Sequence, residues 1–358
     1  MRNFILPWRI FTLVSVWVAL VAGNVATAAD PVALRAESFV VTPSTGPLAI
    51  VDVKNLLDVP YQGSVAMTAP EGWQIAPAAR DVSLAPGELR RVSFAIERGR
   101  DDAGNSYPIE VSATGGGATV VRRQNVVVAS APYFKPVIDG DLSEWKDAIP
   151  VTFTSGGKKT TVSTYWNRRQ FAILIAVEED RLVRFDEAQV FDAVQLSISP
   201  QEAVTGTSPD EEATRFEFLF RAAAADNDDD DDGKGDCFQL ATPGTRLSET
   251  ATARALGPLG YDDAQVAVAR EDGATYYECS LPFRPMRDLI RPSEGREFRL
   301  SVLVHDPDGT GIRDLGQAAG LWPSQRNALA WSRWTGAKWG EKPPFDNKIE
   351  WGLCSSQY

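Results

Sequence analysis

Apolar and polar side chains alternate along short segments in the first third of the chain. Val92, Phe94 and Ile96 fall on one side of an extended segment, and polar or small residues fall on the other. A period of two, interrupted by turns such as Pro86-Gly87, is typical of half-buried antiparallel strands. No segment here has the period of a helix. The expected strands are residues 48–53, 64–68, 90–96, 107–113 and 120–128.

Strand-like segments also dominate the rest of the chain, after the alternation is interrupted around Pro132. One helical turn is expected over residues 142–148, with Asp141 or Ser143 as its N-cap. The best strand candidates are residues 165–177, 193–198, 214–220, 265–269, 276–281, 298–304 and 348–353. We therefore predict an all-β protein, with a first β-sandwich at residues 30–131 and a larger β-sandwich at residues 132–358.

The first 29 residues have the features of a secretory signal peptide. Arg2 and Arg9 precede an apolar run over residues 10–23, and small residues lead up to Asp30. A short apolar core followed by an A-x-A-like site is typical of a cleaved leader, and the run is shorter than the roughly 20 residues that span a bilayer. No later run is long and apolar enough to span. We expect a protein that is secreted, periplasmic or on the cell surface, without membrane insertion after cleavage.

The charge balance limits the partners. The chain has 36 basic and 48 acidic residues, a net charge of −12, which becomes −14 when Arg2 and Arg9 leave with the signal peptide. Nucleic acid binding needs clustered lysine and arginine, so no nucleic acid partner is expected. Anionic membrane surfaces also attract basic segments, so binding to such a surface is excluded on the same ground.

Three cysteines are too few for a disulfide scaffold. At most one intrachain bridge can form among Cys237, Cys279 and Cys354, and the sequence leaves the pairing open. Cys279 lies in an alternating run, so we expect it to be a buried apolar residue.

The sequence has no recognisable catalytic machinery. The only histidine is His305, which excludes metal sites built from two or three histidines and disfavours a histidine-based triad. No nucleophile elbow, Walker loop or dinucleotide fingerprint is present. Carboxylates are plentiful, but none lies in a motif that would raise its pKa. We therefore predict that the protein is not an enzyme.

A run of aspartates has the spacing of a calcium loop. Asp228, Asp230 and Asp232 stand at alternate positions before a glycine, Lys234 can offer its carbonyl, and Asp236 follows. Alternate oxygens of this kind converge on a hard cation, so we expect a structural Ca²⁺ site. A glutamine replaces the bidentate glutamate of an EF-hand, and the loop is more similar to those of thrombospondin type 3 repeats. The alternative is a solvated acidic loop without a defined site.

The first sandwich resembles the bacterial immunoglobulin-like domains that occur beside glycosidase domains and carbohydrate modules. Residues 51–55, 69–73, 82–88 and 106–111 carry the resemblance. These motifs mostly encode strands and turns, and Trp73 is expected to be a core or strand-edge anchor. The resemblance implies an immunoglobulin-like sandwich that could dock on a protein partner.

The second sandwich resembles the family 9 carbohydrate-binding modules, which are related to DOMON domains. The matching segments arrive in the family's order across nearly the whole domain: residues 136–145, 162–167, 171–180, 191–198, 276–283 and 298–309. The resemblance implies a jelly-roll-like sandwich that binds a polysaccharide or glycan without catalysis. Such modules stack sugar rings on tryptophan and bind the hydroxyls with polar side chains.

The tryptophans of this chain depart from the family pattern. The first clamp tryptophan of the family would fall near Gln189, where there is none. The second clamp would come from the aromatic-rich tail. Three tryptophans of this tail lie among residues typical of loops and are the candidate ligand contacts: Trp322, Trp334 and Trp339. Trp145, Trp166 and Trp351 are expected to be structural.

Two alternatives to sugar binding remain open. The protein could be an exported structural or adhesive protein that has lost its sugar clamp. The minor alternative is that the protein binds haem, as related sandwiches do. Met286 and His305 are then the plausible axial ligands besides lysines.

Overall fold

The computed structural model describes residues 30–185, 190–203, 206–224, 233–318, 327–332 and 344–354. The chain is all-β, as predicted, and its strands form four sheets. By its contacts the chain from Pro31 to Tyr358 is one compact unit, so the boundary expected at residue 131 stays a prediction. The helices found in the described ranges are all too short or too polar to cross a bilayer.

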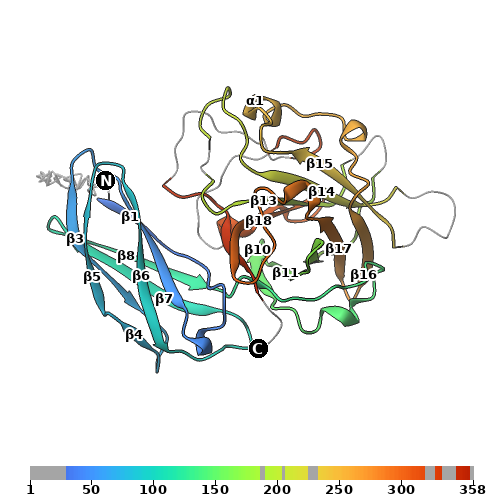
Figure 1. Cartoon of the computed structure of the whole chain (residues 1–358). Helices are drawn as coiled ribbons and strands as arrows, with labels where there is room; N and C mark the ends of the chain where they lie inside the picture. The colour runs from blue at the N-terminus through green and yellow to red at the C-terminus, as the bar shows by residue number, and fades with distance from the viewer. Residues whose placement is uncertain are drawn as a thin grey trace, which may run out of the picture. The chain divides into compact units, whose positions relative to one another are not determined.

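Strands β1 to β8 form a sandwich of two four-stranded antiparallel sheets, here called the first sandwich (Figure 1). Val92, Phe94 and Ile96 are buried between the sheets, as their alternation predicts. Trp73 packs on Phe39 and Tyr107 at its edge. In sheet order, the strands are β1 (Val32–Ala36), β2 (Leu48–Asn55), β6 (Leu89–Arg98) and β4 (Gln74–Ala76), facing β5 (Ala79–Leu84), β3 (Tyr61–Thr68), β7 (Tyr107–Gly115) and β8 (Ala118–Val126).

Strands β9 to β20 form the second sandwich, with one five-stranded and one seven-stranded sheet. Neighbouring strands are antiparallel except β20 and β9. The five-stranded sheet has the order β10 (Val151–Ser155), β11 (Lys158–Trp166), β12 (Gln170–Glu178), β17 (Ala274–Pro282) and β16 (Gln265–Glu271). The seven-stranded sheet has the order β15 (Gly235–Ala241), β14 (Phe216–Ala222), β13 (Ala193–Pro200), β18 (Arg296–Asp306), β20 (Ile349–Leu353) and β9 (Ser130–Ala131), with β19 (Gly311–Asp314) also pairing with β18.

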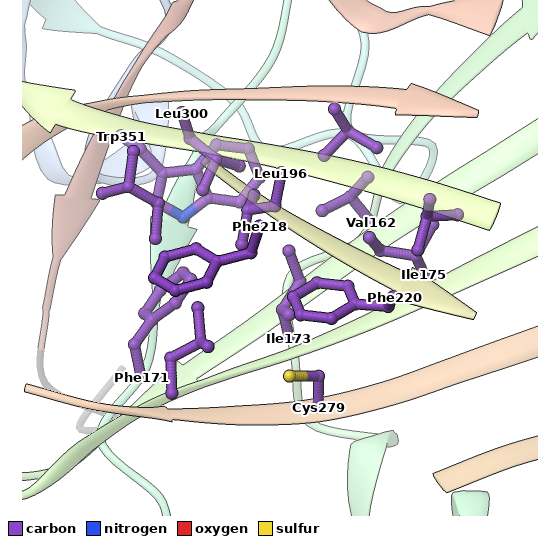
Figure 2. Packing of buried hydrophobic residues seen from close by; sticks show 14 of the residues in the cluster. Val162, Phe171, Ile173, Ile175, Leu196, Phe218, Phe220, Cys279, Leu300 and Trp351 are labelled. Carbon is purple, nitrogen blue, oxygen red and sulfur yellow. The ribbon is translucent and has the colours of Figure 1, made fainter. Parts of the chain in front are cut away.

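The main hydrophobic core lies between these two sheets. Figure 2 shows Ile173 and Ile175 of β12 in one packed cluster with Leu196 of β13 and Phe218 and Phe220 of β14. The strands have β-branched and aromatic residues at every second position, which suits a pleated surface that is buried on one side. Cys279 belongs to this core, as predicted, and the three cysteines are buried and are not joined in a disulfide.

One predicted strand is wrong, and short helices fill the connections. Residues 165–177 were expected as a single strand, but they belong to a hairpin in which β11 ends at Trp166 and β12 begins at Gln170. The cause is Asn167, whose side-chain oxygen accepts hydrogen bonds from the backbone of Arg169 and Gln170 and closes the turn. The helical turns are Pro43–Thr45, Leu142–Trp145, Leu247–Thr250 (α1), Gly257–Leu259, Arg284–Met286 and Leu315–Ala318 (α2). The turn at Leu142 was predicted, with Asp141 as its cap.

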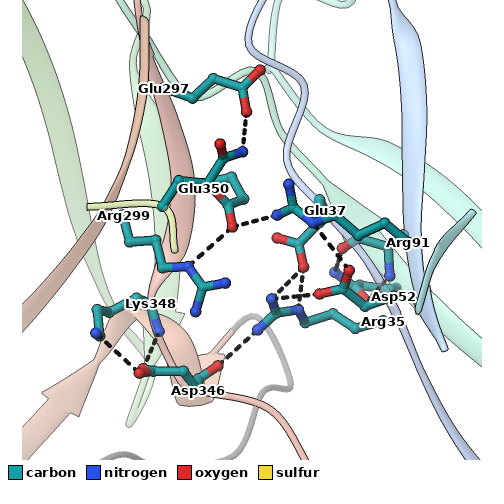
Figure 3. A network of polar contacts seen from close by, with 12 residues as sticks. Arg35, Glu37, Asp52, Arg91, Glu297, Arg299, Asp346, Lys348 and Glu350 are labelled. Atoms are coloured by element: carbon teal, nitrogen blue, oxygen red, sulfur yellow. Dashed lines mark hydrogen bonds and ion pairs between the residues drawn. The ribbon is translucent and has the colours of Figure 1, made fainter. Parts of the chain in front are cut away.

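A charged network joins the two sandwiches (Figure 3). Arg91 of β6 donates to Glu350 of β20 at 2.7 Å, and Arg299 of β18 donates to the same oxygen at 3.1 Å. Arg35 of β1 donates to the carbonyl oxygen of Asp346 at 2.8 Å. Breaking a buried ion pair leaves an uncompensated charge. These contacts therefore favour one way of packing the first sandwich against the second.

Candidate functional site

The outward face of the seven-stranded sheet carries a row of polar side chains that are fully buried. Alternation sends the apolar residues of β13, β14 and β18 into the main core and leaves their neighbours on the opposite face. This row, here called the polar row, comprises Gln195, Ser197, Glu217, Ser301 and His305, each at most 1% exposed. Buried polar groups are costly unless they are hydrogen-bonded, so such a row requires an explanation.

Hydrogen bonds link most of the row across three strands. Gln195 Nε2 donates to Glu217 Oε2 at 3.1 Å, and Gln195 Oε1 lies 3.1 Å from His305 Nε2. Because the glutamine oxygen can only accept, Nε2 of the imidazole carries the proton in this bond. Arg215 donates to Glu217 Oε1 at 2.5 Å. The glutamate is therefore held as an ion-paired acceptor.

A segment close to the C-terminus, residues 327–332, covers the polar row. The backbone nitrogen of Asn327 lies 3.3 Å from Glu217 Oε2, and its side-chain amide donates to the same oxygen. Ser332 Oγ lies 2.9 Å from Nδ1 of His305. The covering segment thus presents an amide and a hydroxyl to the acid and the imidazole of the row.

Trp331 of the covering segment lies at the aromatic end of this face. Its ring centroid is 4.1 Å from that of Phe191 and 5.1 Å from that of His305. Phe191 stands in the region where the family pattern called for a tryptophan, and it is buried. A hollow of about 20 Å³ lies beside Trp331, His305 and Ser332. That volume holds roughly one water molecule, so a sugar ring needs the covering segment to move.

Ser197 is the member of the row whose hydroxyl has no hydrogen-bond partner among the described residues. It stands between Glu217 on β14 and Ser301 on β18 in the register of the sheet. An unsatisfied buried hydroxyl costs about 1–3 kcal/mol. The Ser197 hydroxyl can therefore still donate and accept a hydrogen bond in the middle of a polar face.

The sequence-predicted site residues lie mostly outside the described residues. This holds for the candidate sugar contacts and for the first three ligands of the expected calcium loop: Trp322, Trp334, Trp339, Asp228, Asp230 and Asp232. Lys234 is described, and its carbonyl oxygen accepts from the backbone nitrogen of Ala223. Asp236 pairs with Arg221 at 2.8 Å. The calcium loop stays a prediction.

The three tryptophans expected to be structural are buried. Trp145 donates to Glu278 at 2.8 Å, and Trp351 donates to Thr164 Oγ1 at 3.0 Å. Trp166 donates to the carbonyl oxygen of Cys354. Each indole nitrogen therefore has a partner inside the second sandwich, which confirms their structural role.

The pair suggested for haem does not converge. Met286 is packed in the main core between the sheets. His305 lies on the outward face, and both of its ring nitrogens are within hydrogen-bond distance of other side chains. The two side chains lie on opposite faces of the seven-stranded sheet, so the geometry does not favour a haem held between them.

Sequence reasoning missed the polar row as a site. The alternation of Gln195 and Ser197 with apolar residues was readable, and so was Glu217 between two phenylalanines. Nothing in that alternation indicates that the polar side is buried, because the cover comes from residues far along the chain. Trp331 was visible only as one of several tryptophans in the tail.

Comparisons with known proteins give a distant likeness. No family model matches the chain, and no curated protein matches it in sequence. Two similar solved structures are of a family 9 carbohydrate-binding module from Caldicellulosiruptor kristjanssonii, one in complex with cellotriose and one with glucose. They are 12% and 11% identical and cover 63% of this chain and 92% and 94% of the module, with TM-scores of 0.37 and 0.36. A TM-score below 0.5 does not establish a shared function.

Proposed function

We propose that this chain is an exported, non-catalytic glycan-binding protein of the cell surface or periplasm, and that the polar row of the second sandwich is where it binds sugar. The observation that carries the proposal is a continuous set of buried hydrogen-bonding side chains beside Trp331. The order of family 9 segments along the sequence supports the same class of ligand.

The chemistry of the row suits sugar hydroxyls, which both donate and accept. Glu217 offers a charged acceptor, Gln195 offers a donor and an acceptor, and His305 offers a ring nitrogen. In the closed arrangement, Asn327 and Ser332 supply the amide and hydroxyl that contact two of these groups. Hydroxyls of a bound glycan replace them one for one, and Ser197 gains a partner that it lacks.

Aromatic rings next to the row supply the second requirement. The apolar face of a pyranose packs on an aromatic ring, while polar side chains contact its rim. Trp331 is placed for this, and we assign the same stacking role to Trp322, Trp334 and Trp339, which flank it in sequence. Binding by such modules is weak, on the order of −4 to −8 kcal/mol.

We assign the polar row no reaction. A glycosidase needs two carboxyl groups about 5–10 Å apart on either side of the bond that is cut. Glu217 is the one carboxylate of the polar row, and Arg215 holds it as an ion pair. The aspartate loop, with Asp228, Asp230, Asp232, Lys234 and Asp236, is proposed to bind a structural Ca²⁺.

A structural or adhesive protein is the second candidate. The observation that favours it is the covering segment, since Asn327 and Ser332 already contact Glu217 and His305. An acid and an imidazole that are already hydrogen-bonded by their own chain need no ligand.

A glycan array separates the two candidates. The full chain, expressed with its own leader, is compared with Trp331→Ala and with Phe134→Ala. Phe134 is a matched control because it is aromatic, 40% exposed and packed on Tyr165, away from the polar row. We expect binding by the wild type and the control, and loss of signal in Trp331→Ala. An array without signal for the wild type, or with equal signals for all three proteins, supports the structural candidate instead.

A further inference from the structure

Three carboxylates meet at one end of the second sandwich, away from the aspartate run in sequence. Glu179 follows β12, Asp192 precedes β13, and Asp306 ends β18. Ala193 pairs with His305, so the antiparallel register brings Asp192 beside Asp306. One carboxylate oxygen from each residue lies within 4.8 Å of the others. We call these three residues the acid trio.

The acid trio is buried, and half of its oxygens lack hydrogen-bond partners. Glu179, Asp192 and Asp306 are 3%, 1% and 3% exposed. Both carboxylate oxygens of Glu179 and Oδ1 of Asp192 accept no hydrogen bond from the described residues. A buried carboxylate oxygen without a hydrogen bond is far more costly than such an amide or hydroxyl, and two of the three residues that converge here carry one.

The neighbouring polar groups compensate only part of this charge. Asp306 is well satisfied, because its Oδ2 accepts from the backbone and hydroxyl of Thr310 and from Arg313 at 2.6 Å. Oδ2 of Asp192 accepts from the backbone of Val183. Glu179 and the second oxygen of Asp192 accept no hydrogen bond from the described residues.

Arg270 lies within ion-pair distance of Glu179, but its hydrogen bonds go to atoms other than the carboxylate oxygens. Its Nη1 lies 3.7 Å from Glu179 Oε1 but donates to Thr275 Oγ1 at 2.9 Å. Its Nη2 donates to the backbone carbonyl of Glu179. Burial, reinforced by the neighbouring carboxylates, raises the pKa of Glu179 to about 7 and that of Asp192 to about 8.

We propose that the acid trio binds a divalent cation, Ca²⁺, through Glu179, Asp192 and Asp306. An all-oxygen set of carboxylates is the donor set of hard cations, and Ca²⁺ accepts irregular arrangements in which water completes the shell. Glu179 comes from the five-stranded sheet and the two aspartates come from the seven-stranded sheet. The ion therefore ties the two sheets together at this end. This site is separate from the aspartate loop and does not depend on sugar binding.

The test compares thermal unfolding of the full chain in chelator and in millimolar Ca²⁺. The variant is E179Q/D192N, which keeps side-chain volume and removes two charges whose free oxygens accept no hydrogen bond. The matched control is D228N/D230N/D232N, which removes charge from the aspartate loop and leaves the trio intact. An ion present at about 100 times its dissociation constant raises the melting temperature of a domain of this size by about 5–10 °C.

We expect E179Q/D192N to lose the part of the wild-type rise that the acid trio contributes and the loop control to keep that part, with calorimetric titration showing one fewer Ca²⁺ bound by E179Q/D192N than by the wild type. A rise in E179Q/D192N as large as in the wild type with the same number of Ca²⁺ bound, or no rise in the loop control, overturns the proposal. If E179Q/D192N does not fold, E179Q alone serves the same comparison. The glycan array signal of E179Q/D192N reports on sugar binding alone. Failure of the Ca²⁺ proposal can therefore be told apart from failure of the glycan proposal.

Discussion

Two neighbours in the polar row should respond to substitution in opposite ways. Glu217 and Ser197 face each other across β14 and β13, and both side chains are fully buried. The perturbations are Glu217→Gln, which keeps the shape and removes the charge, and Ser197→Ala, which removes a hydroxyl. The two positions share their surroundings, so burial alone predicts similar effects.

The hydrogen bonds of Glu217 set the magnitude of the first change. One oxygen accepts from Arg215, and the other accepts from Gln195 and from Asn327. In either orientation, the amide of a glutamine here points its own NH₂ group at one of these donors, and the ion pair with Arg215 is lost. Removing one member of a buried ion pair costs about 3–5 kcal/mol, so Glu217→Gln should lower the free energy of unfolding by that amount.

Ser197→Ala should be neutral or stabilising by up to about 1 kcal/mol, because its hydroxyl has no partner to lose. Urea unfolding followed by circular dichroism measures both free energies on the full chain. A cost below about 1 kcal/mol for Glu217→Gln, or a loss for Ser197→Ala as large as for Glu217→Gln, would refute the hydrogen-bond assignment of this face.

Two further predictions concern the core and pH. Trp351→Ala should cost about 3–5 kcal/mol, because Trp351 is fully buried and bonded to Thr164; urea unfolding should show a smaller loss for Trp351→Phe, and equal losses would contradict the packing. In chelator, the raised pKa values of Glu179 and Asp192, about 7 and 8 against 4.5 and 3.8 when unfolded, mean that the folded chain binds more protons between about pH 4 and 8. The free energy of unfolding should therefore fall as pH rises through that window, and a rise there, or the same slope in E179Q/D192N, would count against it.

The strands of this fold could largely be predicted from the sequence. The alternation at Val92, Phe94 and Ile96 and at Leu196 and Ile198 corresponds to buried faces in both sandwiches. The hairpin at Asn167 was missed, because continuous apolar residues on both sides conceal a turn that depends on one side-chain oxygen.

The site and the acid trio could not be predicted in the same way. Glu179, Asp192 and Asp306 are scattered along the sequence and meet only because strand register and sheet stacking bring their ends together. The polar row is buried by a segment more than a hundred residues away from Glu217. Sequence spacing indicates local geometry, whereas these features depend on tertiary contacts.

The central claim is that a glycan binds on the outward face of the seven-stranded sheet. The most direct test is the dissociation constant, from isothermal titration calorimetry, of the wild type and Ser197→Ala for the array glycan with the strongest signal. A lost hydrogen bond of about 0.5–1.5 kcal/mol predicts that Ser197→Ala binds about 2–10 times more weakly at unchanged stability. Equal dissociation constants, or no glycan that binds the wild type, would contradict the claim.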